Sequence, residues 1–234
     1  RGALFNKINK LAEAKTQLEQ ALALAKANDN KSQIIKTLLQ LCSVSFDAGE
    51  TERSTGYARE AVDLAQKNGM ENLSALALVN LGNSFLIRGQ PSEAQNYLSQ
   101  ALESAQRAKA RRTEATARVS LASLRQQQNK PDEVIQFLEP AMRFYQQGGY
   151  QSETFRCLVL MVRANRQKGD YAAAQTGSEQ LMQLAQAAND QSLLALAHAE
   201  RGSSLADQEK FTEALDHFNQ AGELYSAQGV QRSI

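Results

Sequence analysis

Residues 78–85 read Leu78-Val79-Asn80-Leu81-Gly82-Asn83-Ser84-Phe85, and the rest of the chain copies this stretch at intervals of 40 residues. A step of 40 from Gly82 meets only small or apolar residues, which are Gly2, Cys42, Gly82, Ala122, Val162 and Gly202. The same step from Ala101 meets Ala21, Ala61, Ala101, Ala141, Leu181 and Ala221. A constant period of this length indicates a solenoid of stacked repeats.

Each period contains two helical patterns and two breaks. In the third period, apolar residues three or four apart predict a first helix over about residues 73–88. Gly89 predicts its end, because glycine readily adopts the left-handed conformation of a helix C-cap, and Pro91 suits the first turn of a second helix. The column through Gly89 is nearly all glycine or asparagine: Asn9, Gly49, Gly89, Asn129, Gly169 and Glu209.

These signals predict one repeat domain over residues 1–234. We expect a partial repeat over residues 1–29, with its main helix at 11–27, and complete repeats over 30–69, 70–109, 110–149, 150–189 and 190–229. Residues 230–234 would begin a further repeat, since Gln231 matches Gln151 and Gln191. We therefore expect both ends to be cut from a longer repeat protein.

The repeated pattern of Leu78, Leu81-Gly82, Phe85, Ala94, Leu98 and Ala101 resembles the tetratricopeptide repeat (TPR) in its 40-residue variety. The resemblance implies an all-α, right-handed α-solenoid, a superhelix of stacked antiparallel helical hairpins, similar to the arrays of kinesin light chains and of bacterial regulators. The family favours large apolar or aromatic residues where this chain has Leu78 and Phe85. The fourth repeat departs from it with Arg118 and Arg125, which concerns the packing of those helices and not the fold.

Composition excludes several classes of function. Lys and Arg number 26 against 25 Asp and Glu, so no overall charge points to direct contact with nucleic acid or an anionic membrane. Cys42 and Cys157 lie in different repeats and are interpreted as reduced packing residues. That interpretation fits a cytoplasmic location.

No catalytic constellation is apparent, and we expect neither an enzyme nor a cofactor. His198 and His217, the two histidines of the chain, fall on the two helices of one repeat and could approach each other. Without a carboxylate or thiol at ligand spacing they make a poor metal site. We interpret them as ordinary surface or half-buried histidines.

In the TPR family the first helices of successive repeats line the concave groove, so their outer faces are the candidate binding surface. Asn80 and Asn83 are its sharpest feature, because a side-chain amide can pair with a peptide backbone of any sequence. The Asn80-Leu81-Gly82-Asn83 stretch resembles kinesin light chains, in which such asparagines hold a bound peptide. The alternative is a pair of surface asparagines without a ligand. The groove residues that we predict are Lys36, Gln40, Phe46, Leu76, Val79, Asn80, Asn83, Leu86, Arg156, Arg163 and Arg166.

Arg156, Arg163 and Arg166 share one face of the first helix of repeat five. Their guanidinium groups are suited to the carboxylates of an acidic ligand segment. The alternative, which we favour, is that Glu or Asp residues of a neighbouring repeat pair with them.

The sequence therefore predicts a non-catalytic scaffold or adaptor that binds a protein or peptide segment, with an acidic end to that segment. One alternative is a ligand- or peptide-sensing module of a bacterial signalling ATPase or transcription activator, since similar arrays form the sensors of such proteins. A purely structural spacer is a third. The last helix carries Phe211, Leu215 and Phe218, so we also expect this fragment to associate end to end.

Overall fold

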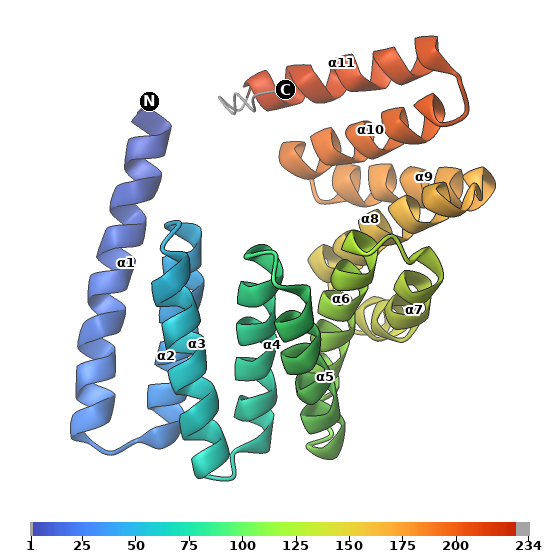
Figure 1. The fold of residues 1–234 in the computed structure, drawn as a ribbon. Coiled ribbons are helices and arrows are strands. Elements are labelled where there is room, and N and C mark those ends of the chain that lie inside the picture. Colours follow the sequence, from blue (N-terminus) through green and yellow to red (C-terminus); the bar gives the residue numbers. More distant parts are fainter. Residues whose placement is uncertain (1, 228–234) are drawn as a thin grey trace. The chain divides into compact units, whose positions relative to one another are not determined.

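The computed structural model describes residues 2–227, with side chains described from residue 10 onward. Within this range the chain consists of α-helices joined by short turns (Figure 1). Their bounds are α1 (Gly2–Ala27), α2 (Lys31–Asp47), α3 (Thr51–Lys67), α4 (Glu71–Ile87), α5 (Pro91–Arg107), α6 (Arg111–Gln127), α7 (Pro131–Gln147), α8 (Gln151–Lys168), α9 (Tyr171–Ala187), α10 (Gln191–Ala206) and α11 (Phe211–Ala227). The predicted all-α solenoid of helical hairpins is confirmed.

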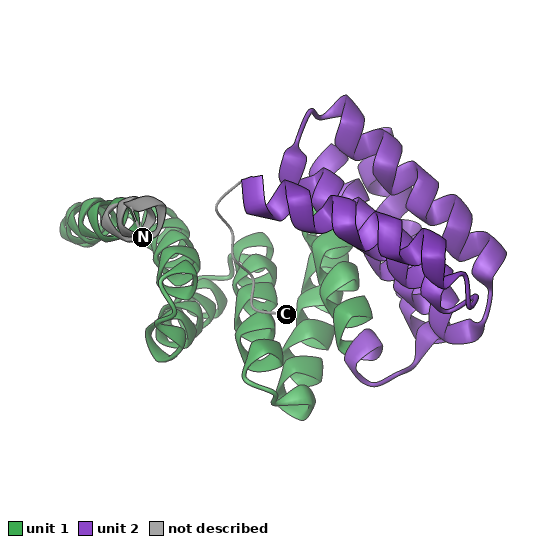
Figure 2. Ribbon diagram, turned by 90° about the horizontal axis from the view of Figure 1, so that it is seen from above, with its two compact units in different colours: residues 1–124 green, residues 125–234 purple. Residues whose placement is uncertain are grey.

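The chain divides into two compact units, residues 1–124 and residues 125–234 (Figure 2). We call them the N-terminal and C-terminal units and describe each by itself. The division falls inside α6 (Arg111–Gln127). The single repeat domain expected over residues 1–234 stays a prediction.

The turns between helices recur every 20 residues. A residue with positive φ ends each helix from α1 to α10: Asp29, Gly49, Gly69, Gly89, Lys109, Asn129, Gly149, Gly169, Asn189 and Glu209. At Gly89 the Gln90 N–H donates to the Phe85 carbonyl at 3.0 Å and the Gly89 N–H donates to the Leu86 carbonyl at 3.2 Å. This is the Schellman arrangement, which satisfies carbonyls that the end of a helix leaves unpaired. The predicted breaks at residues 49, 89, 129, 169 and 209 are confirmed.

One predicted break is wrong. Asn9 occupies the break column, yet α1 runs through it as a single helix from Gly2 to Ala27. A continuous helix keeps the backbone hydrogen bonds of this segment within α1, with no turn at Asn9. The further helix expected from Gln231 lies outside the described residues.

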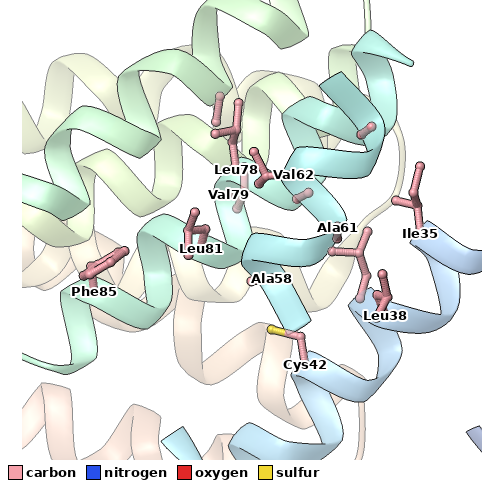
Figure 3. Packing of buried hydrophobic residues seen from close by; sticks show 14 of the residues in the cluster. Ile35, Leu38, Cys42, Ala58, Ala61, Val62, Leu78, Val79, Leu81 and Phe85 are labelled. Atoms are coloured by element: carbon pink, nitrogen blue, oxygen red, sulfur yellow. The ribbon is translucent and has the colours of Figure 1, made fainter. Parts of the chain in front are cut away.

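The core of the N-terminal unit is a continuous apolar cluster that runs from α1 to α6, with most of its members on α2, α3 and α4. Figure 3 shows α3 presenting alanines to the larger residues of α2 and α4, an arrangement that lets the helices approach closely. The labelled members are Ile35, Leu38, Cys42, Ala58, Ala61, Val62, Leu78, Val79, Leu81 and Phe85. First helices of consecutive repeats also touch, α2 with α4 in this unit and α8 with α10 in the other.

In the hairpins of repeats three and six, a glycine on the first helix is matched by a large residue on the second. Gly82 faces Leu98, and a Cβ atom on Gly82 would lie 2.6 Å from Leu98 Cγ. Gly202 faces Phe218 in the same way, at 2.8 Å. At the equivalent place in repeat five the sizes are reversed, with Val162 on the first helix and Ser178 on the second. Close packing requires the summed volume at such a contact to stay nearly constant.

The two arginines in aromatic positions are accommodated by pairing. In the N-terminal unit, Arg118 Nη2 donates to Glu114 Oε1 at 2.9 Å. In the C-terminal unit, the buried Arg125 pairs with Glu133 and donates to Gln128 Oε1 at 2.9 Å. Its guanidinium carbon also lies 6.0 Å from the centre of the Phe137 ring. A buried charge is tolerated when it is paired and hydrogen-bonded in this way.

Candidate functional site

An exposed strip runs along α4 on the side of the predicted groove. Leu76, Asn80, Asn83 and Ile87 recur at offsets of four, seven and eleven, so they share one helical face. Leu76 and Ile87 are exposed, and the two asparagines between them are half-buried. We call these four residues the α4 strip. Lys36, Gln40 and Phe46 are also exposed, on α2, which contacts α4.

Two predicted groove residues are corrected. Val79 and Leu86 are buried members of the apolar cluster. They turn inward because α4 is packed against α2, α3 and α5 and is therefore covered over most of its circumference. Ile87 was missed by sequence reasoning, although its offset of four from Asn83 was a signal that could have found it.

The two asparagines have unused hydrogen-bonding capacity. Asn80 Nδ2 donates to the Leu76 carbonyl of its own helix at 3.1 Å, which leaves Oδ1 and one N–H for a ligand. Among the described residues, no side-chain partner is found for Asn83. Each amide can therefore both donate to and accept from a peptide backbone placed along the α4 strip.

The arginines of α8 lie in the C-terminal unit, and two of them are already paired. Arg163 donates to Glu200 Oε1 from Nε at 2.8 Å and from Nη2 at 2.5 Å. Arg166 Nη1 lies 3.7 Å from Glu200 Oε2, and its Nε donates to Asp207 Oδ2 at 2.6 Å. Glu200 and Asp207 belong to the next first helix and its C-cap. This is the pairing with a neighbouring repeat that the sequence left open as an alternative.

These charges line a cleft of about 540 Å³, with Tyr171 and Ser203 also on its wall. Two arginines face two carboxylates there, so their charges cancel. Arg156 is exposed on α8 outside this cleft. The charge argument for an acidic ligand therefore rests on Arg156.

The two histidines do meet. His198 Nδ1 and His217 Nδ1 are 3.0 Å apart, a hydrogen bond across the α10–α11 hairpin in which one ring donates and the other accepts. Burial lowers the pKa of His198, and His217 lowers it further. Burial is also the main cause that lowers the pKa of His217, followed by Arg201, while Asp216 and Glu213 act in the opposite direction. The pair is thus a neutral packing contact at neutral pH.

Neither cysteine is set up as a nucleophile. Cys42 and Cys157 are free and buried, as predicted. Burial raises the pKa of Cys42 and raises that of Cys157 to about 12. Since the thiolate is the reactive form, both thiols are inert near neutral pH. In the described part of the chain, no three His, Cys, Asp or Glu side chains gather where they could hold a metal ion.

Comparison with known families settles the class of this fold. The tetratricopeptide repeat family model matches residues 33–107 and, in a second overlapping window, residues 73–147. The chain is a tetratricopeptide repeat array. No curated protein sequence matches it significantly. Within residues 2–227, no TPR helix is both long and apolar enough to span a bilayer.

Solved structures share the fold of this TPR array. BtubC (BKLC) from P. vanneervenii superposes with a TM-score of 0.76 at 17% identity, covering 99% of this chain and 94% of that one. A Rap protein complexed with competence and sporulation factor gives 0.72 at 13% identity, covering 99% and 74%. YrrB, a TPR protein with an unusual peptide-binding site, gives 0.56 at 15% identity, covering 90% and 95%. At these identities the likeness shows the fold alone.

Proposed function

We propose that this TPR array is a non-catalytic scaffold that binds a protein or peptide segment on the α4 strip and the adjoining exposed face of α2. The observation that carries the proposal is the strip itself, in which two amides with free hydrogen-bonding capacity lie between two exposed apolar side chains. The two amides can hydrogen-bond to the backbone of a ligand, and the two apolar side chains can contact its apolar side chains. That combination suits a peptide.

The distance between Leu76 and Ile87 indicates how far apart the apolar side chains of the ligand should be. Leu76 and Ile87 are eleven residues apart on one helix, which corresponds to about 16 Å at 1.5 Å per residue. An extended peptide covers that distance with about five residues. The preferred segment would therefore carry two apolar side chains about four or five positions apart, with its backbone against Asn80 and Asn83.

An acidic ligand segment remains part of the proposal in a narrowed form, for the C-terminal unit taken by itself. Glu200 and Asp207 already neutralise Arg163 and Arg166, so an acidic ligand would have to displace them. Arg156 is the arginine we propose for that contact.

A related structure supports a second candidate function. The Rap protein was crystallised with competence and sporulation factor, which favours a sensing or regulatory module of a bacterial signalling protein. A nucleotide-binding or DNA-binding domain in the same polypeptide would favour that role over an adaptor. Two free, buried cysteines are in keeping with the cytoplasmic location that we propose for either role.

Asparagine-to-alanine exchange tests the peptide site. Peptides selected from a phage-displayed random library on the unmodified protein should bind an Asn80→Ala/Asn83→Ala variant about 5–150-fold more weakly. This corresponds to about 1–3 kcal/mol for the lost hydrogen bonds. Isothermal titration calorimetry would measure the affinity, and circular dichroism would show an unchanged melting temperature.

Asn96→Ala supplies the matched control, since Asn96 is exposed on α5 and its amide contacts only Gln100 among the described residues. It should leave peptide affinity unchanged. If the selected peptides bind the double variant as tightly as they bind the unmodified protein, the α4 strip is not their binding site.

Self-association is a further part of the proposal. On α11, Phe211, Leu215 and Phe218 are exposed at offsets of four and seven. Phe218 is 41% exposed, whereas Ala58, Leu98, Leu138 and Ser178 at the same place in earlier repeats are all 0% exposed. The α11 face thus has the apolar character of a repeat interface without its cover, a condition that favours association.

Sedimentation velocity across a concentration series would test this. We expect the apparent mass of the protein to rise with concentration, and a Phe211→Ser/Leu215→Ser variant to remain monomeric, because the exchange removes apolar area from the contact. A protein that is monomeric at every concentration would contradict the proposal.

A further inference from the structure

Two pockets occupy the same place in repeats three and five. The first pocket lies between the end of α3, the start of α4 and the second half of α5. The second lies between the end of α7, the start of α8 and the second half of α9. Leu78, Gln100 and Gln66 line the pocket of the N-terminal unit, and Leu158, Gln180 and Gln146, each 80 residues later, line that of the C-terminal unit. The pockets measure about 240 and 500 Å³. The same backbone therefore carries one narrow and one wide pocket.

Side chains of the N-terminal unit narrow its pocket. Arg107 Nε donates to Glu71 Oε1 at 3.2 Å across the mouth, and Met70 contributes to the lining. At the equivalent places of the wide pocket stand Ala187 and Gln151, which cannot form an ion pair. Tyr150, the equivalent of Met70, stacks on Phe144 with ring centres 5.7 Å apart and is not part of the wall.

The wide pocket has an apolar floor and an uncharged rim. Tyr145 and Leu158 are buried at its base and Leu184 is half-buried beside them. Gln146, Gln151, Gln180 and Gln183 are exposed around them. None of the described residues that line it is charged, whereas the narrow pocket has Glu71, Glu103 and Arg107. A charged ligand would find no counterion in the wide pocket, and burying an unpaired charge is costly.

We propose that this glutamine-rimmed pocket is a second recognition site, which takes one apolar side chain of an uncharged peptide segment. Its volume lies in the range of pockets that enclose a small ligand, so a leucine-sized side chain fits. The glutamine amides around it both donate and accept, and so match the N–H and C=O groups on either side of such a side chain. The site lies in the C-terminal unit and shares no residue with the α4 strip. Its failure would leave the proposed function untouched.

The narrow pocket supplies the variant for the test. The closing variant, Gln151→Glu with Ala187→Arg, copies the Glu71–Arg107 pair onto the wide pocket, at two exposed positions where folding is not at risk. The opening variant, Glu71→Gln with Arg107→Ala, makes the reverse exchange in the narrow pocket of the N-terminal unit. The probes are N-acetyl-leucine methylamide, which carries one apolar side chain between two peptide bonds, and its aspartate counterpart.

Methyl NMR on leucine-labelled protein reads out each pocket separately, through Leu158 and Leu184 or through Leu78. We expect the leucine probe, and not the aspartate probe, to shift the Leu158 and Leu184 methyl signals. The closing variant should weaken this binding at least about tenfold, as expected for an apolar side chain that loses its pocket. The opening variant should produce a new shift at Leu78.

Three outcomes would overturn the proposal. The first is an absence of shifts at Leu158 and Leu184 up to the solubility limit of the leucine probe. The second is a closing variant that binds as tightly as the original. The third is equally tight binding of benzyl alcohol, which has an apolar group but no peptide bond, because the glutamine rim would then have no part in recognition. Should the closing variant melt early, the opening variant and the two probes still decide the question.

Discussion

Replacing Gly82 with alanine is expected to lower the free energy of unfolding by about 1–3 kcal/mol. The new Cβ would lie 2.6 Å from Leu98 Cγ and 3.3 Å from the Leu98 backbone nitrogen. Leu98 is 0% exposed and cannot swing into solvent, so α4 and α5 would have to move apart. Urea unfolding followed by far-UV circular dichroism would measure the loss.

Gly56→Ala is the matched control, because it makes the same exchange in a helix of the same unit. No neighbouring atom lies within 4 Å of a Cβ on Gly56. The exchange should therefore raise stability by about 0.5–1 kcal/mol, the usual gain from replacing glycine inside a helix. Changes of the same sign in both variants would contradict the close contact between Gly82 and Leu98.

Replacing Glu200 with glutamine is expected to destabilise the C-terminal unit by about 1–3 kcal/mol. The Glu200 side chain is 6% exposed, and its carboxylate receives two hydrogen bonds from Arg163 and lies 3.7 Å from Arg166. The exchange would leave two arginines facing each other with Asp207 as their remaining carboxylate partner. Thermal and urea unfolding would measure the effect.

Glu179→Gln is the control for this charge. Glu179 is 56% exposed and lies 3.7 Å from Arg201, so it forms a surface pair. Such pairs contribute about 0–1 kcal/mol. If the Glu200 and Glu179 variants lose the same stability, the buried carboxylate does not tie α8 to α10 in the way its geometry indicates.

The Gly82 and Glu200 variants help to distinguish an effect of helix packing on peptide affinity from an effect of direct contact with the ligand. Neither Gly82 nor Glu200 belongs to the α4 strip or to the glutamine-rimmed pocket. A change in peptide affinity in the Gly82 variant would therefore report a change in helix packing. The Glu200 exchange also uncovers Arg163 and Arg166, so tighter binding of an acidic peptide by that variant would report direct contact with these arginines. The Asn80, Asn83, Gln151 and Ala187 exchanges report the contacts with ligand.

The candidate surface shows where sequence patterns stop being informative. A helical wheel identifies residues that share a face, and it placed Leu76, Asn80 and Asn83 together correctly. It did not show how far the neighbours of α4 reach around the helix, so Val79 and Leu86 were assigned to the groove although they are buried. Burial depends on three other helices, whose positions no local pattern contains.

The class of fold and the recurring breaks at residues 49, 89, 129 and 169 follow from the sequence alone. They depend on local patterns, such as apolar residues three or four apart and Gly89 directly after the C-cap of α4, and a 40-residue period displays these patterns directly. The stacked helices were needed to show that Arg163 and Arg166 are neutralised by Glu200 and Asp207, and that the pocket of the C-terminal unit is the wider of two equivalent pockets. Arg163 and Glu200 are 37 residues apart and belong to consecutive repeats, so they meet only when those repeats stack. Glu71 and Arg107 are 36 residues apart at opposite ends of one repeat, and they meet only when α4 and α5 fold back on each other.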